Sequence, residues 1–488
     1  MIAGMALAAV LLNAPAEAAL ADCHVAGIAQ GVQCGVVRRP LDPADAGRGS
    51  IDVGYVVVPA LARRKLADPV FMLAGGPGQS ATALASTVLP VVARLNTRRD
   101  IVFVDQRGTG RSAPLVCADP NPGELAEQAD PERQFKQLMR CKAELLKLPY
   151  IHAERDLGLF TTAIAVQDLD AVRRALGAEQ VDLVGGSYGT RVGLEYLRQF
   201  PTRVRRAVLD GVAPPDMVLP ASFSVDNQAA FDALLAACRA EPACAAAHPK
   251  LHLHWESLLA SLPRPVVARH PLTGREERFT LTREMVLSAV RGALYAPWLA
   301  AALPVAIERA DEGEPEGLLG LAATFTSRKS TQLAIGMHFS VVCAEDLPRL
   351  ADATERPAAD FGNDFAATYE RMCAGWPRGA VPEAFYRVGP SMAPVLLLSG
   401  GADPATPPRH GERVARLLGA RARHVVVPNA GHGTMALGCL RDVVYKFIDA
   451  ADTDTALAVD ASCVAGIPRP PAFRPIAPGA DSPPEPMR

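Results

Sequence analysis

A serine set between glycines is the first pattern in this chain that could do chemistry. Residues 185–189 read Gly-Gly-Ser-Tyr-Gly, a G-x-S-x-G sequence centred on Ser187. The apolar run VDLV precedes it and a helical pattern follows. This order predicts a sharp strand-to-helix turn that exposes the Ser187 hydroxyl as a nucleophile. The amide of Tyr188 would then open the helix and could point at a developing oxyanion.

Two motifs late in the chain supply the partners of a nucleophilic serine, whose hydroxyl needs a base to remove its proton. GADPATP follows the apolar run PVLLL and contains Asp403, and AGHGT follows the run HVVV and contains His432. Serine, acid and histidine in this order fit the turn motif, so we expect His432 as general base and Asp403 as the group that orients it. Asp210 is the alternative acid, although a turn-forming role is its preferred interpretation.

A glycine-rich turn at residues 74–78, Ala-Gly-Gly-Pro-Gly, follows the apolar run VFML. Its backbone N–H groups can approach a substrate oxygen without interference from side chains. We therefore expect the second oxyanion donor here, at Gly76, with Gly75 as the alternative. The turn is not typical of a phosphate loop, because no G-K-[ST] follows and the spacing is not G-x-G-x-x-G.

Other polar residues have simpler interpretations. In DQRGTGRS, Asp105 and Arg107 are expected to brace loops through a buried charge pair. His252 and His254 lie two apart in a helical pattern and cannot share a face, so we do not expect a metal there. The ten cysteines show no C-x-x-C pair and no zinc spacing, and the expected chemistry needs no cofactor.

The elements that would position these residues alternate between strands and helices. Short apolar runs bounded by Gly, Pro or Asp are typical of strands buried on both faces of a mostly parallel sheet. They lie at 53–58, 69–73, 101–104, 181–184, 205–209, 394–398 and 424–427. Helical patterns at 162–176, 188–199 and 409–418 separate several of them, which predicts an α/β fold with helices on both faces.

One long segment interrupts the alternation. Residues 216–385 are rich in Ala and Leu and contain no comparable strand ladder, which predicts a helical cap inserted between two strands. Its helical runs lie near 222–240, 249–261, 282–309 and 315–325. The core would then have two parts, 22–215 and 386–465, followed by a Pro-rich tail at 466–488 that is extended or disordered.

The N-terminus and the cysteines indicate the compartment. Residues 2–12 are one apolar run, too short for a bilayer, and A-x-A patterns of small residues follow it. We therefore expect a signal peptide at 1–21 and export to a periplasm or the medium, with a buried N-terminal helix as the alternative. An exported protein would oxidise its cysteines, and buried free thiols are the alternative. The simplest expectation is sequential pairing: 23–34, 117–141, 238–244, 343–373 and 439–463.

Composition narrows the classes of function. Of the 488 residues 49% are hydrophobic, which is too many for a disordered protein. The formal net charge of −2 gives no reason to expect nucleic acid, which needs a clustered positive surface. No other run is long and apolar enough to predict a membrane span. The oligomeric state does not follow from the sequence.

Five motifs resemble, in order, those of the proline iminopeptidase and tripeptidyl aminopeptidase family of α/β-hydrolases: GGPGQS, DQRGTGRS, GGSYGT, GADPATP and AGHGT. The resemblance implies an α/β-hydrolase fold with a cap over the active site, and exopeptidase action at a free peptide N-terminus. It also implies Ser187 as nucleophile, Asp403 as acid and His432 as base. Many iminopeptidases have His and Trp where this chain has Ala74 and Tyr188. These two differences count against a proline-only specificity more than against hydrolysis.

The secreted tripeptidyl branch of that family resembles this chain further, in Cys343-Ala-Glu345 and Cys373-x-x-Trp376-Pro377. An aminopeptidase must meet the α-ammonium of its substrate with a carboxylate, because burying that charge unpaired costs several kcal/mol. The resemblance favours Glu345, with its neighbour Asp346 as the alternative, and a surface carboxylate is the simpler interpretation.

Three functions follow from these observations. The first is an exported serine aminopeptidase, of prolyl or tripeptidyl type, acting on peptides with a free N-terminus. The second is a carboxylesterase or another hydrolase of small esters or amides, because the scaffold does not fix the substrate. The third is a binding module that has kept the fold, and a complete set of Ser, His and Asp argues against it.

Overall fold

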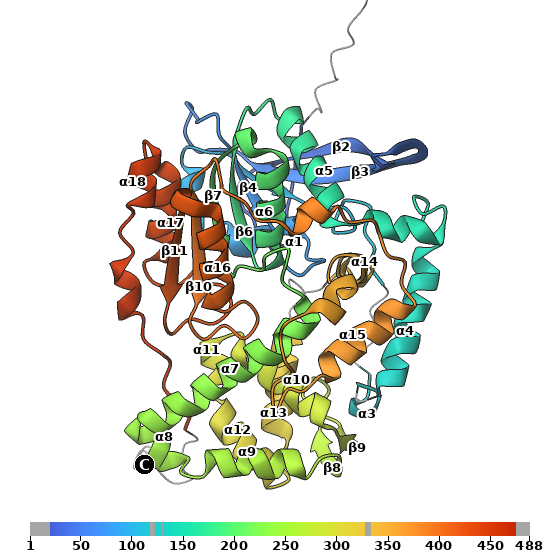
Figure 1. Ribbon diagram of the computed structural model, residues 1–488, viewed down its shortest axis with the longest axis vertical. Helices are drawn as coiled ribbons and strands as arrows, with labels where there is room; N and C mark the ends of the chain where they lie inside the picture. The colour runs from blue at the N-terminus through green and yellow to red at the C-terminus, as the bar shows by residue number, and fades with distance from the viewer. Residues whose placement is uncertain (1–19, 118–122, 129, 327–332, 475–488) are drawn as a thin grey trace, which may run out of the picture.

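The computed structural model describes residues 20–117, 123–128, 130–326 and 333–474. A nine-stranded sheet with the order β1-β2-β3-β5-β4-β6-β7-β10-β11 forms its centre (Figure 1). The strands from β5 to β11 are parallel, and β1 to β3 extend the sheet antiparallel. The strands are β1 Ala21–Cys23, β2 Val32–Asp42, β3 Asp45–Val58, β4 Val70–Leu73, β5 Ile101–Val104, β6 Val181–Gly186, β7 Val204–Asp210, β10 Val395–Gly400 and β11 Ala422–Val427.

All seven predicted apolar runs correspond to strands of this sheet, which confirms the mostly parallel α/β fold. The run at 53–58 is the end of β3 and pairs antiparallel with β5. The long hairpin of β2 with the first half of β3 was not predicted. Its residues 45–50 are almost all exposed, so the hydrophobic pattern there is too weak to indicate a strand.

Helices cover both faces of the sheet. Successive residues of β4 face opposite sides: Phe71 and Leu73 join one buried cluster, and Val70 and Met72 join the other. The first cluster includes residues of α5 Thr162–Ala175, α6 Tyr188–Gln199 and α16 Pro408–Leu418. The second includes residues of α1 Ala81–Val88, α2 Ala93–Asn96 and α17 Leu440–Asp449. Three further helices are α3 Leu125–Gln128, α4 Pro131–Leu145 and α18 Thr453–Leu457.

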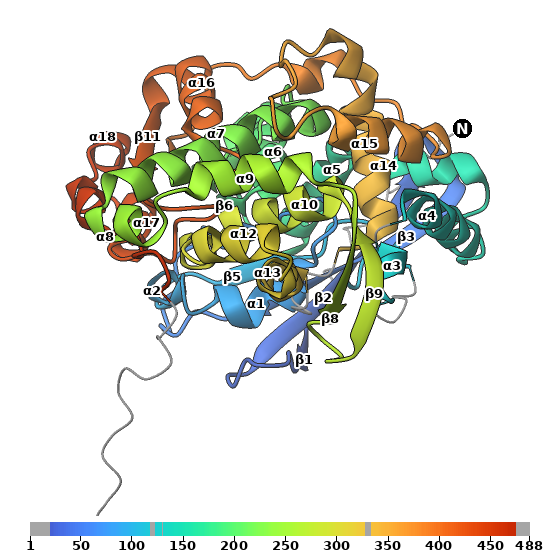
Figure 2. The same cartoon turned by 90° about the horizontal axis from the view of Figure 1, so that it is seen from below.

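The segment between β7 and β10 forms the cap, at the bottom of Figure 1 and facing the viewer in Figure 2. Most of its helices enclose a separate buried cluster. The helices are α7 Leu219–Ala240, α8 Pro242–Ala247, α9 Leu251–Ala260, α10 Arg283–Leu294, α11 Pro297–Ala300, α12 Leu303–Asp311, α13 Glu316–Thr326, α14 Ile335–Glu345 and α15 Asp364–Ala374.

Two features of the cap differ from the expectation of a purely helical insertion. Strands β8 Arg264–Arg269 and β9 Glu276–Leu281 form a separate hairpin. The helical run at 282–309 is divided into α10, α11 and α12, and prolines occupy the first turns of α11 and α12. Proline starts a helix readily but cannot continue one, so the division follows from the sequence.

All ten cysteines lie in the described residues, and they pair sequentially as predicted. Cys343–Cys373 joins α14 to α15. In the described part of the chain, no helix is long and apolar enough to cross a membrane. Residues 1–19 of the signal peptide predicted at 1–21 and the end of the tail, from residue 475, lie outside the described residues. The last residue of the predicted signal peptide, Ala21, is the first residue of β1.

Candidate active site

The turn around Ser187 has the predicted strand-to-helix geometry. Ser187 follows β6, precedes α6 and has φ 55° and ψ −125°, which costs a non-glycine residue about 1–3 kcal/mol. The glycines on either side of this turn have no room for a side chain. A Cβ on Gly189 would lie 2.2 Å from the carbonyl oxygen of Leu73. A Cβ on Gly185 would lie 2.5 Å from the carbonyl oxygen of Gly189. The strained backbone therefore needs the glycines of the motif.

Asp403 and His432 meet at the same edge of the sheet. His432 Nδ1 donates to Asp403 Oδ2 over 2.8 Å. The other carboxylate oxygen accepts the backbone N–H groups of Ala405 and Thr406, at 2.8 and 2.9 Å. The Thr406 hydroxyl donates to Oδ2 and lies 3.1 Å from His432 Nδ1. Thr406 is a member of this group that sequence reasoning missed, although the motif GADPATP contains it.

Asp403 and His432 each stabilise the charged form of the other. Burial opposes the ionised form of Asp403, but His432 and the hydrogen bonds hold the pKa of this carboxyl below its usual range. Burial opposes the charged imidazole too, yet the neighbouring Asp403, with a smaller contribution from Asp210, raises the pKa of His432. The pair can therefore take up a proton on His432 while Asp403 stays ionised.

Asp210, the alternative acid, makes no hydrogen bond to the imidazole. Its side chain accepts the backbone N–H groups of Thr434 and Met435 and the Thr434 hydroxyl. Its backbone carbonyl accepts the N–H of Ser187 at 2.8 Å. Asp210 thus fixes the loop that carries His432 and the turn that carries Ser187, and burial raises its pKa.

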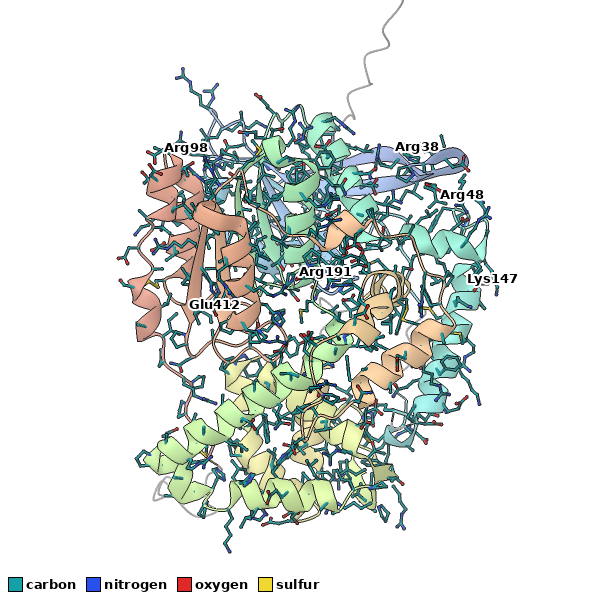
Figure 3. All side chains as sticks on the ribbon, viewed as in Figure 1. Arg38, Arg48, Arg98, Lys147, Arg191 and Glu412 are labelled. Atoms are coloured by element: carbon teal, nitrogen blue, oxygen red, sulfur yellow. A yellow bond between two sulfur atoms is a disulfide. The ribbon has the colours of Figure 1, made fainter. Side chains whose placement is uncertain are left out.

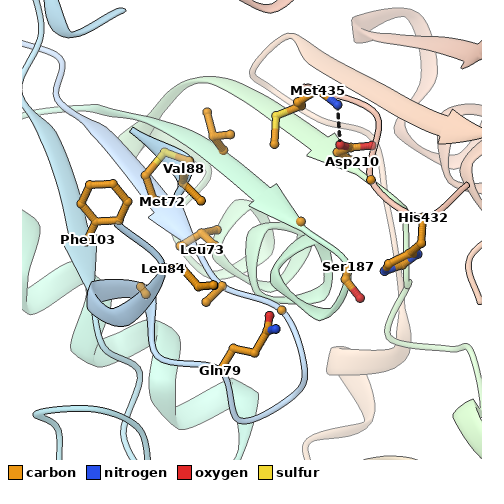
Figure 4. Close-up of a pocket in the computed structure, with 16 residues that line it drawn as sticks. Met72, Leu73, Gln79, Leu84, Val88, Phe103, Ser187, Asp210, His432 and Met435 are labelled. Atoms are coloured by element: carbon orange, nitrogen blue, oxygen red, sulfur yellow. Dashed lines mark hydrogen bonds between the residues drawn. The ribbon is translucent and has the colours of Figure 1, made fainter. Parts of the chain in front are cut away.

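Ser187 and His432 line one cavity of about 240 Å³, and Figure 4 shows their side chains next to each other. Gly75 lines it as well, and a Cβ there would lie 3.2 Å from the Ser187 Cβ. A Cβ on Gly76 would instead lie 2.6 Å from the amide nitrogen of Gly78. Of the two expected oxyanion donors in this turn, only Gly75 is among the residues that line the cavity with Ser187.

Glu345 and Asp346 are buried at the end of α14, where they face Arg191 of α6. Glu345 accepts the backbone N–H and hydroxyl of Thr162, and Arg191 lies 3.4 Å from Oε2. Asp346 accepts two hydrogen bonds from the Arg191 guanidinium, both 3.1 Å long. Figure 3 shows Arg191 in the interior of the molecule. Neither carboxylate is among the residues that line the cavity.

The side chain of Tyr188 reaches the same cluster. Its hydroxyl lies 2.5 Å from Thr162 Oγ1 and accepts a hydrogen bond from Gln106. Burial and the charge of Glu345 raise the pKa of Tyr188, so this phenol stays protonated. The ring thus anchors the first residue of α6, whose amide is the expected oxyanion donor.

Two cap residues contact the site without having been predicted. The carbonyl of Tyr295 accepts the backbone N–H of His432, and the two rings pack edge to face at 5.0 Å. His338 of α14 lies with Nδ1 3.2 Å from the carbonyl of Pro77 and Nε2 2.8 Å from the Tyr369 hydroxyl. Burial lowers the pKa of His338 to about 4, so it is a neutral donor to the turn at 74–78.

Asp105 and Arg107, which we expected to brace loops, do make buried bracing contacts, but with partners other than the expected ones. Asp105 and Arg107 do not pair with each other. Arg107 binds Asp168, and Asp105 accepts hydrogen bonds from Ser80 and Thr82. His252 and His254 contact separate carboxylates, at Glu256 and Asp311. In the described residues, no three His, Cys, Asp or Glu side chains gather as a metal site.

The fold and this site define a class of proteins. The sequence profile of the alpha/beta hydrolase fold matches residues 68–438, and the chain belongs to that family.

Relatives narrow the class further. The chain is 26% identical over 474 residues to the tripeptidyl aminopeptidase of Streptomyces coelicolor, with 90% of this chain and 84% of the relative covered. It is 26% identical over 378 residues to the serine protease Hip1 of Mycobacterium tuberculosis, covering 70% and 71%. It is 28% identical over 420 residues to carboxylesterase B of that organism, covering 80% and 78%. The resemblance to the tripeptidyl aminopeptidase family is confirmed, and peptidase and esterase names both occur among the relatives.

Proposed function

We propose that this protein is an exported serine aminopeptidase that hydrolyses peptide bonds near the free N-terminus of its substrates, with prolyl or tripeptidyl specificity. The hydrogen bond from His432 to the buried Asp403, at a cavity that Ser187 also lines, is the observation that carries this proposal. The relatives named as a serine protease and a tripeptidyl aminopeptidase support it. No metal or cofactor is needed for this chemistry.

The proposed mechanism is acyl transfer. Ser187 attacks the scissile carbonyl while His432 Nε2 takes its proton. The amide of Tyr188 and an amide of the turn, from Gly76 or Gly75, stabilise the oxyanion, and loss of one such donor typically costs about 3 kcal/mol. His432 then protonates the leaving amine, and water releases the acyl group by the same route in reverse.

Labelling and product analysis test this proposal. A fluorophosphonate probe should label the native protein but not the Ser187→Ala variant. Mass spectrometry of a peptide mixture should show release of short units from the N-terminus only. Internal cleavage, or equal cleavage of peptides with acetylated N-termini, would contradict the aminopeptidase type.

Glu345 is proposed as the carboxylate for the substrate α-ammonium, with Asp346 as the alternative. Since both oxygens of Glu345 contact Thr162 or Arg191, an ammonium would have to replace one of these contacts. Glu345→Gln should then weaken hydrolysis of free-amine peptide anilides and spare p-nitrophenyl esters. Asp346→Asn is the matched variant, and equal loss on both substrate types would reject the anchor role of the residue changed.

A carboxylesterase is the second candidate, because a relative carries that name and the cavity at Ser187 is largely apolar. The same triad serves both reactions. Higher kcat/KM for p-nitrophenyl esters, together with no preference for free over N-acetylated peptide anilides, would favour the esterase.

Export rests on the five disulfides, which form in oxidising compartments. Fractionation of a cell that expresses the full chain should place the disulfide-bonded protein in the periplasm or the medium. A reduced protein confined to the cytoplasm would contradict export.

A further inference from the structure

None of the described residues between β7 and β10 lines the cavity at Ser187. Its walls come from the ends of the central strands, from α1 and from the loop after His432. The lining residues with apolar side chains are Met72, Leu73, Ala74, Ala81, Leu84, Val88, Phe103, Val184 and Met435. Figure 4 shows Ser187 and His432 on one side of the cavity and Met72, Val88 and Phe103 on the other.

Of the four polar side chains that line the cavity, Ser187 and His432 belong to the proposed catalytic set, which leaves Gln79 and Asp210. Gln79 is neutral, and both oxygens of Asp210 accept hydrogen bonds from Thr434 or Met435. A charged group that reached the apolar walls opposite Ser187 would lose its hydration without gaining a polar partner there. The chemistry of the walls therefore selects an uncharged, apolar occupant.

The cavity owes part of its space to Gly186, the first of the two variable residues of the G-x-S-x-G motif. Gly186 lines the cavity, and a Cβ built there would meet no other atom within 4 Å. Its φ is not in the left-handed region, so a side chain is compatible with its backbone. The absence of a side chain at this position leaves room directly beside the nucleophile.

Given the proposed serine hydrolase function, we propose that this cavity binds the apolar side chain of the substrate residue whose carbonyl Ser187 attacks. Its volume of about 240 Å³ is below the roughly 300–1,000 Å³ of sites for drug-sized ligands, and it suits one side chain or a short acyl chain. The occupant class is an aliphatic group of the size of the leucine or methionine side chain, or the acyl chain of a butanoyl to hexanoyl ester.

Acyl chain length gives the direct test. For p-nitrophenyl acetate, butanoate and hexanoate the leaving group is constant, and kcat/KM should rise by up to about fourfold per methylene that enters the cavity. Tripeptide anilides with Ala, Leu, Met or Asp at the cleaved residue should follow the same trend, with Asp poorest.

Gly186→Leu should fill the cavity and remove the preference for butanoate or hexanoate over acetate, while Leu84→Ala should extend it towards longer chains. Ala83→Leu is the matched control, because Ala83 lies on the exposed side of α1. Thermal unfolding of each variant checks that it folds, and Leu84→Ala keeps the test valid if Gly186→Leu does not.

The proposal would be overturned if the folded Gly186→Leu or Leu84→Ala variant kept the chain-length profile of the native enzyme. It would equally be overturned if the size dependence followed the side chain of the leaving residue in a peptide series. Fluorophosphonate labelling of Ser187 reports on the triad independently, so failure of the cavity assignment is distinguishable from failure of the hydrolase function.

Discussion

Two buried acidic groups lie near the nucleophile turn, and their cationic partners differ. Asp403 is paired one to one with His432, whose charge can change near neutral pH. Glu345 and Asp346 share Arg191, which is always charged and completely buried. The pKa of Asp403 is held low, whereas burial, only partly offset by Arg191, raises the pKa of Glu345 to about 7.

The comparison indicates that burial alone does not tell what a carboxylate does. Asp403 hydrogen-bonds to one base, His432, and this partner can exchange protons, so the pair suits catalysis. At Arg191 two acids face one cation, and one of the two acids, Glu345, has a pKa raised by burial, so it can be neutral in the interior. The hydrogen bonds of this cluster join α14, α6 and Thr162, which is the arrangement of a structural connector with one titratable member.

The largest effect is expected at Asp403. Asp403→Asn removes the charge that stabilises the imidazolium, and kcat should fall by about 10⁴, as for the same change in other triads. Asp210→Asn is the matched control, because it leaves the hydrogen bond to the imidazole intact, and it should cost less than about tenfold. Steady-state hydrolysis of a p-nitrophenyl ester by both variants measures the difference. The reverse order of effects would make Asp210 the catalytic acid.

Arg191→Met tests the other cluster. It leaves two buried carboxylates without their cation, so the free energy of unfolding should fall by about 3–5 kcal/mol. Arg309→Met is the control, since Arg309 pairs with exposed acids and should contribute less than about 1 kcal/mol. Urea unfolding followed by circular dichroism compares them. A loss below 1 kcal/mol for Arg191→Met would mean that the cluster does not stabilise the fold.

The comparison also shows which parts of the site a sequence can reveal. Ser187, Asp403 and His432 each follow an apolar strand at a glycine-rich turn, and such local patterns predicted the edge of the sheet where they meet. The contact of His338 with Pro77 joins residues 261 positions apart and depends on how α14 packs, which no periodicity encodes. The β8–β9 hairpin was missed for a different reason, because its strands are half exposed and short within an Ala- and Leu-rich segment.

The pH dependence of activity should follow His432. Only the neutral imidazole can take the Ser187 proton, and the acids around His432 raise its pKa above the ordinary value. On the acid side, kcat/KM should therefore fall about tenfold per pH unit below that pKa. Asp210→Asn removes one of the charges that raise it, so the acid limb should move to lower pH. A limb that moves upward, or one that survives in His432→Ala, would contradict this assignment.

The smallest expected effect is on the free energy of unfolding as a function of pH, to which Glu345 and Asp403 should contribute with opposite signs. The pKa of Glu345 is raised in the folded state to about 7, so between pH 5 and 7 the folded protein binds more protons than the unfolded chain. Raising the pH through this window therefore lowers the free energy of unfolding, by on the order of 1–3 kcal/mol. Asp403 has a lowered pKa and acts oppositely, because its contribution is lost as the pH falls.

Glu345→Gln keeps an oxygen for the Thr162 contacts but cannot titrate. Urea unfolding at pH 5, 6, 7 and 8 should thus show a flatter decline for this variant than for the native protein. Glu314→Gln, at an exposed acid, should leave the native decline unchanged. If Glu345→Gln declined as steeply as the native protein, Glu345 would be ionised throughout. The Arg191 cluster would then resemble the Asp403–His432 pair in keeping its carboxylates charged, and the contrast between the two groups would rest on the partner's chemistry alone.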